Sequence, residues 1–147
     1  MFKVIIWATD GSSGAERALP FAKGLAQADG ARLVVVHVKE ITAGRGGTYP
    51  VKVDEDKIQT AIGKQVADLK QEGLQATLKL ADVMAGGAAH VIAEIADEEG
   101  ADLIVVGTRG YGPLSGLMLG SVTQRLLHIV HCPVLAVPPK SAGASTS

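Results

Sequence analysis

Short apolar runs of strand length alternate along this chain with longer stretches of helical periodicity. The runs are residues 3–9, 32–39, 74–80, 102–107 and 133–137. Apolar residues between them recur at the three- and four-residue spacing of an amphipathic helix. Strand and helix therefore alternate to the end of the chain, which predicts an α/β fold: an open parallel sheet with helices on both faces.

Helix-start and helix-stop signals indicate where the helices lie. Glu16 follows Ser13 by three residues, which predicts a capping box and a first helix that begins at Ser13. Gly100 is a typical stop after a third helix, because glycine readily adopts the left-handed conformation that ends helices. The later helices are expected at about residues 54–72, at residues 88–99 and from Ser121 onward.

The composition of each run predicts its position in the sheet. The runs around Ile5, Val35 and Val105 are continuously apolar, as strands covered on both faces should be. Residues 74–80 alternate between apolar and polar, which predicts an edge strand with one face in water. Residues 133–137 are apolar but bounded by prolines, which also favour an edge. An apolar edge tends to pair with another chain. We therefore expect a homodimer through Val134, Leu135, Ala136 and Val137.

Length and composition exclude several classes of protein. The chain has 147 residues, enough for one domain with a real core, and the expected division is a domain at 1–139 and a flexible tail at 140–147. A net charge of -1 argues against nucleic acid or an anionic membrane as the partner. No signal peptide and no membrane-spanning run are apparent. The lone cysteine, Cys132, fits a reducing compartment, so we expect a cytoplasmic protein.

The loops that follow the first and fourth runs are the candidates for chemistry. In an open parallel sheet, ligands bind beyond the carboxyl ends of the strands where the winding direction reverses. Gly107 and Gly110 lack a Cβ, so a ligand could approach the backbone there, and Arg109 adds a cation. Gly120 and Ser121 lead into a helix whose first amides favour an anion, with Ser121 as a suitable N-cap. Ordinary turn and capping chemistry would explain the same residues, and spacing alone leaves both interpretations open.

Two common phosphate motifs are absent. The chain has no Gly-x-x-x-x-Gly-Lys-[Ser/Thr] sequence, which excludes a P-loop NTPase. Asp10-Gly11-Ser12-Ser13-Gly14 stands where a dinucleotide fingerprint would be, but its glycine spacing is wrong for a nicotinamide cofactor.

The spacing of the second loop resembles the ATP-binding motif of the universal stress protein family. Gly107-x-x-Gly110 is followed, after nine residues, by Gly120-Ser121. Thr9-Asp10 after the first run, His37-Val38 in the second and the runs 101–107 and 132–137 accompany this motif, so the resemblance covers residues 1–139. It implies a Rossmann-like, adenine-nucleotide α-hydrolase-like fold with strand order 3-2-1-4-5, and dimers formed through the last strand.

The resemblance also implies a ligand and its contacts. The ligand would be ATP, accompanied by a divalent metal such as Mg²⁺. Adenine and ribose would lie against Ala8, Thr9, Asp10 and Val38, and Asp10 would accept hydrogen bonds from the ribose. The phosphates would lie on the glycine loop, and the residues expected there are Val106, Gly107, Arg109, Gly110, Gly120, Ser121 and Val122.

The function implied is that of a nucleotide-dependent stress-response regulator or sensor. A slow ATPase is one alternative, but Asp10 is the only carboxylate that can be placed near the glycine loop, and no catalytic residue is assigned. A module that binds cyclic AMP or AMP is another. His37 is interpreted as a structural hydrogen-bonding residue at a strand end. No metal site within the protein is assigned, because His128 and His131 lack further ligands in the sequence.

Overall fold

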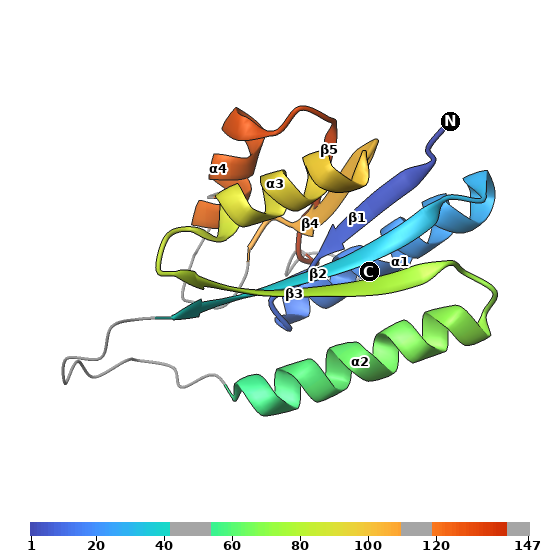
Figure 1. Cartoon of the computed structure of the whole chain (residues 1–147), viewed down its shortest axis with the longest axis horizontal. Helices are drawn as coiled ribbons and strands as arrows, with labels where there is room; N and C mark the ends of the chain where they lie inside the picture. The colour runs from blue at the N-terminus through green and yellow to red at the C-terminus, as the bar shows by residue number, and fades with distance from the viewer. Residues whose placement is uncertain (42–53, 110–118, 141–147) are drawn as a thin grey trace.

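The computed structural model describes residues 1–41, 54–109 and 119–140, and within them the strands form one parallel sheet in the order β3-β2-β1-β4-β5 (Figure 1). The strands are β1 (Val4–Ala8), β2 (Arg32–Ile41), β3 (Ala76–Met84), β4 (Leu103–Gly107) and β5 (Val134–Val137). The helices are α1 (Ser13–Asp29), α2 (Glu55–Gln71), α3 (Ala88–Glu99) and α4 (Ser121–Ile129). The α/β fold, the strand order and both edge strands are confirmed.

Helices cover the sheet on both faces. In Figure 1, α2 lies below the sheet while α3 and α4 lie above it. Side chains of β1 alternate between the two cores: Ile5 and Trp7 pack on the side of α1 and α2, and Ile6 and Ala8 on the side of α3 and α4. Trp7 is fully buried and its indole Nε1 donates to the Ala15 carbonyl at 3.0 Å. Each buried large apolar side chain of this kind contributes about 1.5–3 kcal/mol, so the central strands fix the fold.

The first helix begins at Ser13, as predicted, but its N-cap differs from the prediction. Ser12, not Ser13, is the N-cap, because its hydroxyl oxygen accepts from the Ala15 amide at 3.3 Å. Ser12 has the extended backbone that an N-cap requires (φ -74°, ψ 163°), whereas Ser13 is already the first residue of the helix. The capping box predicted for Ser13 and Glu16 is therefore wrong: the N-cap is Ser12, and Ala15, three residues later, has no polar side chain to complete a box.

The third strand also extends further than predicted. β2 and β3 pair from Leu33–Ala76 out to Ile41–Met84, well past the end of β1. The alternation along this strand predicts Leu80 on the covered face, yet it is 50% exposed. Its register partner is His37, which contacts Glu55, the first residue of α2. Leu80 thus lies at the limit of what α2 covers, and that explains its exposure.

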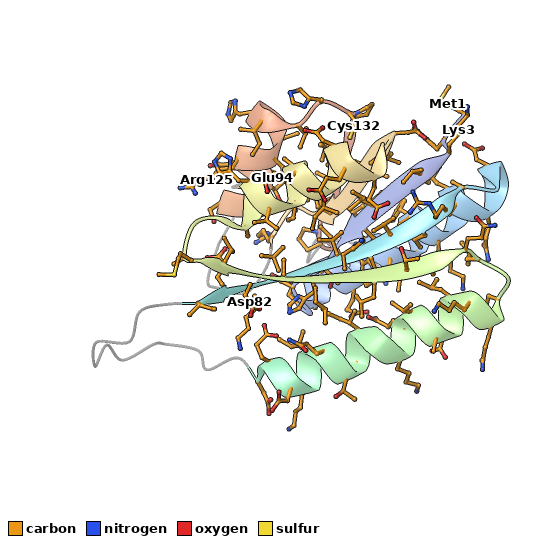
Figure 2. All side chains as sticks on the ribbon, in the orientation of Figure 1. Met1, Lys3, Asp82, Glu94, Arg125 and Cys132 are labelled. Carbon is orange, nitrogen blue, oxygen red and sulfur yellow. The ribbon has the colours of Figure 1, made fainter. Side chains whose placement is uncertain are left out.

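Side-chain bonds tie α4 to the neighbouring turn. Arg125 of α4 donates from its guanidinium to the carbonyl of Gly86, in the turn before α3 (Figure 2). The Gly86 amide in turn donates to the Glu40 carboxylate at 2.9 Å. These bonds connect α4 with the end of β2. Of the predicted tail (140–147), residues 141–147 lie outside the described residues, as does Gly110.

Candidate functional site

The ends of β1 and β4 form the centre of the candidate site. The two strands are neighbours in register from Ile5–Leu103 to Trp7–Val105. β2 lies on the other side of β1, so the chain winds in opposite directions from this point. Loops from parallel strands meet above such a switch point, which is where open α/β sheets bind ligands. The topology therefore places Thr9 and Thr108, which follow neighbouring strands, at the same end of the sheet.

The turn after β1 is held by its own polar side chains. Thr9 is buried, and its amide donates to the Val36 carbonyl at 2.9 Å. The Thr9 hydroxyl accepts from the Gly11 amide at 3.0 Å, and Asp10 Oδ1 accepts from the Ser12 amide at 2.9 Å. Short side chains that bond to the backbone two residues ahead fix a turn in one conformation. Asp10 is thus presented from a rigid turn, and its carboxylate is partly exposed.

The end of β4 is bonded directly to the first turn of α4. The Gly120 amide donates to the Thr108 carbonyl at 2.6 Å, and the Thr123 hydroxyl donates to the Gly107 carbonyl at 2.9 Å. The Thr108 amide donates to the Val137 carbonyl at 3.0 Å, so β5 supports the same turn. The start of α4 is therefore held against the sheet edge.

Among the described residues, no side chain caps the N-terminus of α4. Gly120, not Ser121, is the N-cap residue, so the capping role suggested for Ser121 is wrong. Gly120 is extended (φ -63°, ψ 158°), whereas Ser121 is already helical and exposed. The first intrahelical bond runs from Gln124 to the Gly120 carbonyl, at 3.0 Å. The amides of residues 121–123 precede it and are the donors that an α-helix cannot satisfy internally. This terminus is suited to an anion, and the Ser121 hydroxyl is left to contact a ligand.

The glycine that ends β4 has a packing role that spacing did not reveal. A Cβ on Gly107 would lie 2.6 Å from the carbonyl oxygen of Gly14, in the first turn of α1. A Cβ on Gly14 would lie 2.3 Å from the carbonyl oxygen of Arg109. The space expected to admit a ligand at Gly107 is therefore filled, on the Cβ side, by the backbone of α1. Both glycines are needed so that α1 can lie against the end of β4.

The other predicted contact residues take different positions. Ala8 and Val106 are buried with their side chains in the core of the α3 and α4 side, so they can reach a ligand only through the backbone. Val38 is half-buried on β2, beyond the end of β1. Arg109 is half-buried after β4, and Val122 is half-buried in the first turn of α4. The structure thus places the end of β1 beside Val36 of β2 and next to β4, whose end is bonded to the start of α4.

Comparisons with known proteins identify the family. The model of the universal stress protein family matches residues 1–138. The chain belongs to the universal stress protein family. A universal stress protein from Thermus aquaticus, named for the 3′ region of QAH/OAS sulfhydrylase, is 38% identical over 143 residues, which are 93% of this chain and 99% of the relative.

Two solved structures of universal stress proteins that share the fold are complexes with nucleotides. The universal stress protein of Archaeoglobus fulgidus in complex with dAMP matches with a TM-score of 0.64 and 28% identity, over 93% of this chain and 98% of the other. A universal stress protein in complex with cAMP matches with a TM-score of 0.63 and 26% identity, over 93% and 97%. Both ligands are adenine nucleotides with one phosphate.

Two residues that support the candidate site were not predicted from the sequence of this universal stress protein. Gly14 and Thr123 were not singled out, because their roles depend on α1 and α4 meeting β4 in space. His37 was expected to be structural, and it is 2% exposed with hydrogen bonds on both ring nitrogens. Its partner Glu55 gave no signal beyond its place at a helix start.

Neither a metal site nor a membrane-spanning helix is found among the residues that the structure describes. Within the described ranges, no group of three histidine, cysteine or carboxylate side chains lies close enough to hold a metal. His131 instead faces the Asp97 carboxylate at 3.2 Å. None of the described helices combines the length and the apolar character that crossing a bilayer requires.

Proposed function

We propose that this universal stress protein binds ATP at the ends of β1 and β4 and acts as a nucleotide-dependent regulator or sensor of stress. The observation that carries the proposal is the uncapped N-terminus of α4, which Thr108 and Thr123 hold against the switch point of the sheet. Helix amides and the helix dipole favour negative charge there. The complexes of similar proteins with dAMP and cAMP support an adenine nucleotide as the anion.

The phosphates are proposed to lie on the α4 side of the crevice. The Gly120 amide is used internally, since it donates to Thr108, so the donors left for phosphate are those of residues 121–123. Arg109 follows β4 directly and adds a positive charge. The loop residues assigned by resemblance complete the cradle, namely Gly107, Gly110, Gly120 and Ser121.

The nucleoside is proposed to lie on the β1 and β2 side. Asp10 lies partly exposed on the rigid turn that the buried Thr9 helps to hold, and Val38 supplies an apolar surface beside it. Ala8 and Val106 would contribute backbone groups. Asp10 keeps a partly exposed carboxylate, which suits the hydroxyl groups of a ribose.

Mg²⁺ fits this arrangement as a companion of the phosphates. It prefers oxygen ligands and is usually held by one or two protein groups together with phosphates and water. The exposed Ser121 hydroxyl is the protein oxygen at the start of α4. When bound, the ion would neutralise part of the phosphate charge.

The two alternative functions make different predictions. A slow ATPase needs a base to activate water, and Asp10 is the carboxylate placed near the glycine loop, so this alternative predicts hydrolysis that falls in Asp10→Ala. A module for cyclic AMP or AMP is favoured by the single-phosphate ligands of the similar structures. It would use fewer of the α4 donors than a triphosphate.

The nucleotide on the purified protein tests the proposal. Mass spectrometry of freshly purified, denatured protein should reveal ATP, and calorimetry on stripped protein should give tighter binding for ATP than for AMP or cyclic AMP. The same samples incubated with ATP should release ADP far more slowly than an ordinary enzyme, whose kcat is about 10 s⁻¹. Tighter binding of cyclic AMP would favour the alternative module. No binding of any of the three at millimolar levels would refute the proposal.

A homodimer through β5 is proposed as the assembly. β5 is an edge strand, and Val134, Leu135 and Ala136 are each only half-buried in the single chain. An apolar strand with an open edge is completed most simply by a second copy.

A further inference from the structure

We infer that His37 is a positioning residue that holds the nucleoside side of the site in its binding geometry. The inference rests on the proposed nucleotide function and adds a residue to it. His37 Nδ1 lies 2.8 Å from the Thr9 carbonyl oxygen, and its Nε2 lies 3.1 Å from both carboxylate oxygens of Glu55. The ring thus bridges the turn after β1 and the start of α2.

The position of His37 explains why Thr9 needs a side-chain partner. β1 and β2 remain paired up to Ala8 and Val36, and the Thr9 amide makes one more bond, to the Val36 carbonyl. Beyond this point β1 leaves the sheet and turns towards α1. The Thr9 carbonyl is buried there, and a buried carbonyl without a donor costs about 1–3 kcal/mol. The imidazole supplies the donor where the ladder ends.

The groups that contact the His37 ring indicate where hydrogens lie in these two contacts. A carbonyl oxygen only accepts, so Nδ1 carries a hydrogen and donates to Thr9. The contact of Nε2 with a carboxylate also requires a hydrogen between them. Gln59 donates to the same carboxylate at 3.2 Å, which fixes Glu55 in turn. The ring is therefore fully engaged and 2% exposed, so His37 does not touch a ligand itself.

The bond to Thr9 acts on the ligand through the turn. Thr9 also accepts from Gly11, and Asp10 accepts from Ser12, so the turn moves as one unit with the Thr9 carbonyl. Loss of the Nδ1 bond should shift Asp10 and weaken contacts with the nucleoside. The phosphate donors on α4 are held by separate bonds, from Gly120 to Thr108 and from Thr123 to Gly107, and should not change.

Two variants separate the two halves of the bridge. In His37→Asn, the amide nitrogen stands where Nδ1 was and can still donate to Thr9. In His37→Gln, the amide nitrogen stands where Nε2 was and can reach only Glu55. Each variant keeps one hydrogen bond and loses the other, which makes them matched controls.

Calorimetry with ATP and with inorganic triphosphate is the test. His37→Gln should bind ATP about tenfold more weakly than the unmodified chain, a loss of about 1.4 kcal/mol, while His37→Asn stays within about threefold. Both should bind inorganic triphosphate as the unmodified chain does. Equal ATP affinity in the two variants, or an equal loss for inorganic triphosphate, would overturn the positioning role alone. Absence of ATP binding by the unmodified chain would instead overturn the proposed function, and this inference with it.

If a variant does not fold, NMR of the unmodified chain tests the positioning role of His37. With ¹⁵N-labelled imidazoles, addition of ATP should shift the Nδ1 resonance of His37, and inorganic triphosphate should leave it in place. An Nδ1 chemical shift that does not change at saturating ATP would overturn the inference.

Discussion

The carbonyl oxygen of Gly14 occupies the space that a side chain on Gly107 would need, and a Cβ at Gly107 would lie 2.6 Å from it. The reverse contact is equally close, since a Cβ at Gly14 would lie 2.3 Å from the Arg109 carbonyl oxygen. The first turn of α1 and the end of β4 therefore meet backbone to backbone. This contact sets how close the two loops of the candidate site lie.

Gly14→Ala should destabilise the fold. The new methyl group would overlap a backbone oxygen that Gly120 and Thr108 help to hold, and overpacking of this kind costs about 1–3 kcal/mol. Urea unfolding at neutral pH measures the change in the free energy of unfolding. Gly24→Ala is the matched control, because Gly24 lies in the same helix and a Cβ there would meet no neighbouring atom within 4 Å. It should stabilise by about 0.5–1 kcal/mol, since alanine is the better helix former. Equal effects of the two substitutions would contradict the packing described.

Ser121→Glu should weaken ATP binding at least about tenfold, because one like charge next to the phosphates easily costs about 1.4 kcal/mol. The folded state should not suffer, since a carboxylate in the first turn of a helix is favourable. Ser121→Gln has the same shape without the charge and serves as the control. Calorimetry should show that Ser121→Gln, which loses only the hydroxyl contact, binds ATP clearly more tightly than Ser121→Glu. If the two variants bind ATP equally, the phosphates do not lie at the start of α4.

Ala136→Pro should convert the proposed dimer to a monomer. Residues 133 and 137 accept bonds from β4, from Ile104 and Thr108, so the backbone of Ala136, one residue before 137, points to the open edge. Proline removes its N–H and blocks pairing with a second copy. Light scattering should report the mass of one chain, with circular dichroism unchanged. A mass that stays at two chains would place the contact elsewhere.

Acid should destabilise the protein as its bonded carboxylates become protonated. The Arg32 guanidinium, 3.0 Å away, and Lys79 hold the pKa of Glu99 below its usual 4.5. The backbone amides of Lys3 and Val4 hold the pKa of Asp102 below its usual 3.8. A folded-state pKa below the unfolded value gives stability that is complete above the unfolded pKa and is lost as pH falls through the folded one.

Unfolding curves between pH 7 and pH 3 measure this loss. Glu99→Gln should be less stable than the unmodified chain at pH 7, by up to about 1 kcal/mol as for other largely solvated ion pairs. The gap should narrow as the pH falls through the lowered pKa of Glu99, because the unmodified Glu99 then becomes neutral as well. A gap that is constant with pH would show that the charge of Glu99 contributes nothing.

The sequence by itself determined the fold class and the edges of the sheet. Continuous apolar runs around Ile5 and Val105 predict covered strands, and alternation or flanking prolines predict edges, because each pattern reports how many faces a strand buries. Helix starts and stops were predicted to within a residue or two, for the same local reason. The Thr9-Asp10 turn and the Gly120-Ser121 helix start were also predicted, because turns and helix termini depend on residues that are close together in the sequence.

Only the tertiary structure decided which residues support that site. Gly107 proved to make room for Gly14, and His37 proved to bridge Thr9 and Glu55, through contacts between residues 18 to 93 positions apart. The capping positions at Ser12 and Gly120 were decided by backbone dihedral angles that adjacent serines do not reveal. Local patterns encode burial and turns, whereas contacts between distant backbone groups exist only once the sheet has brought its strand ends together.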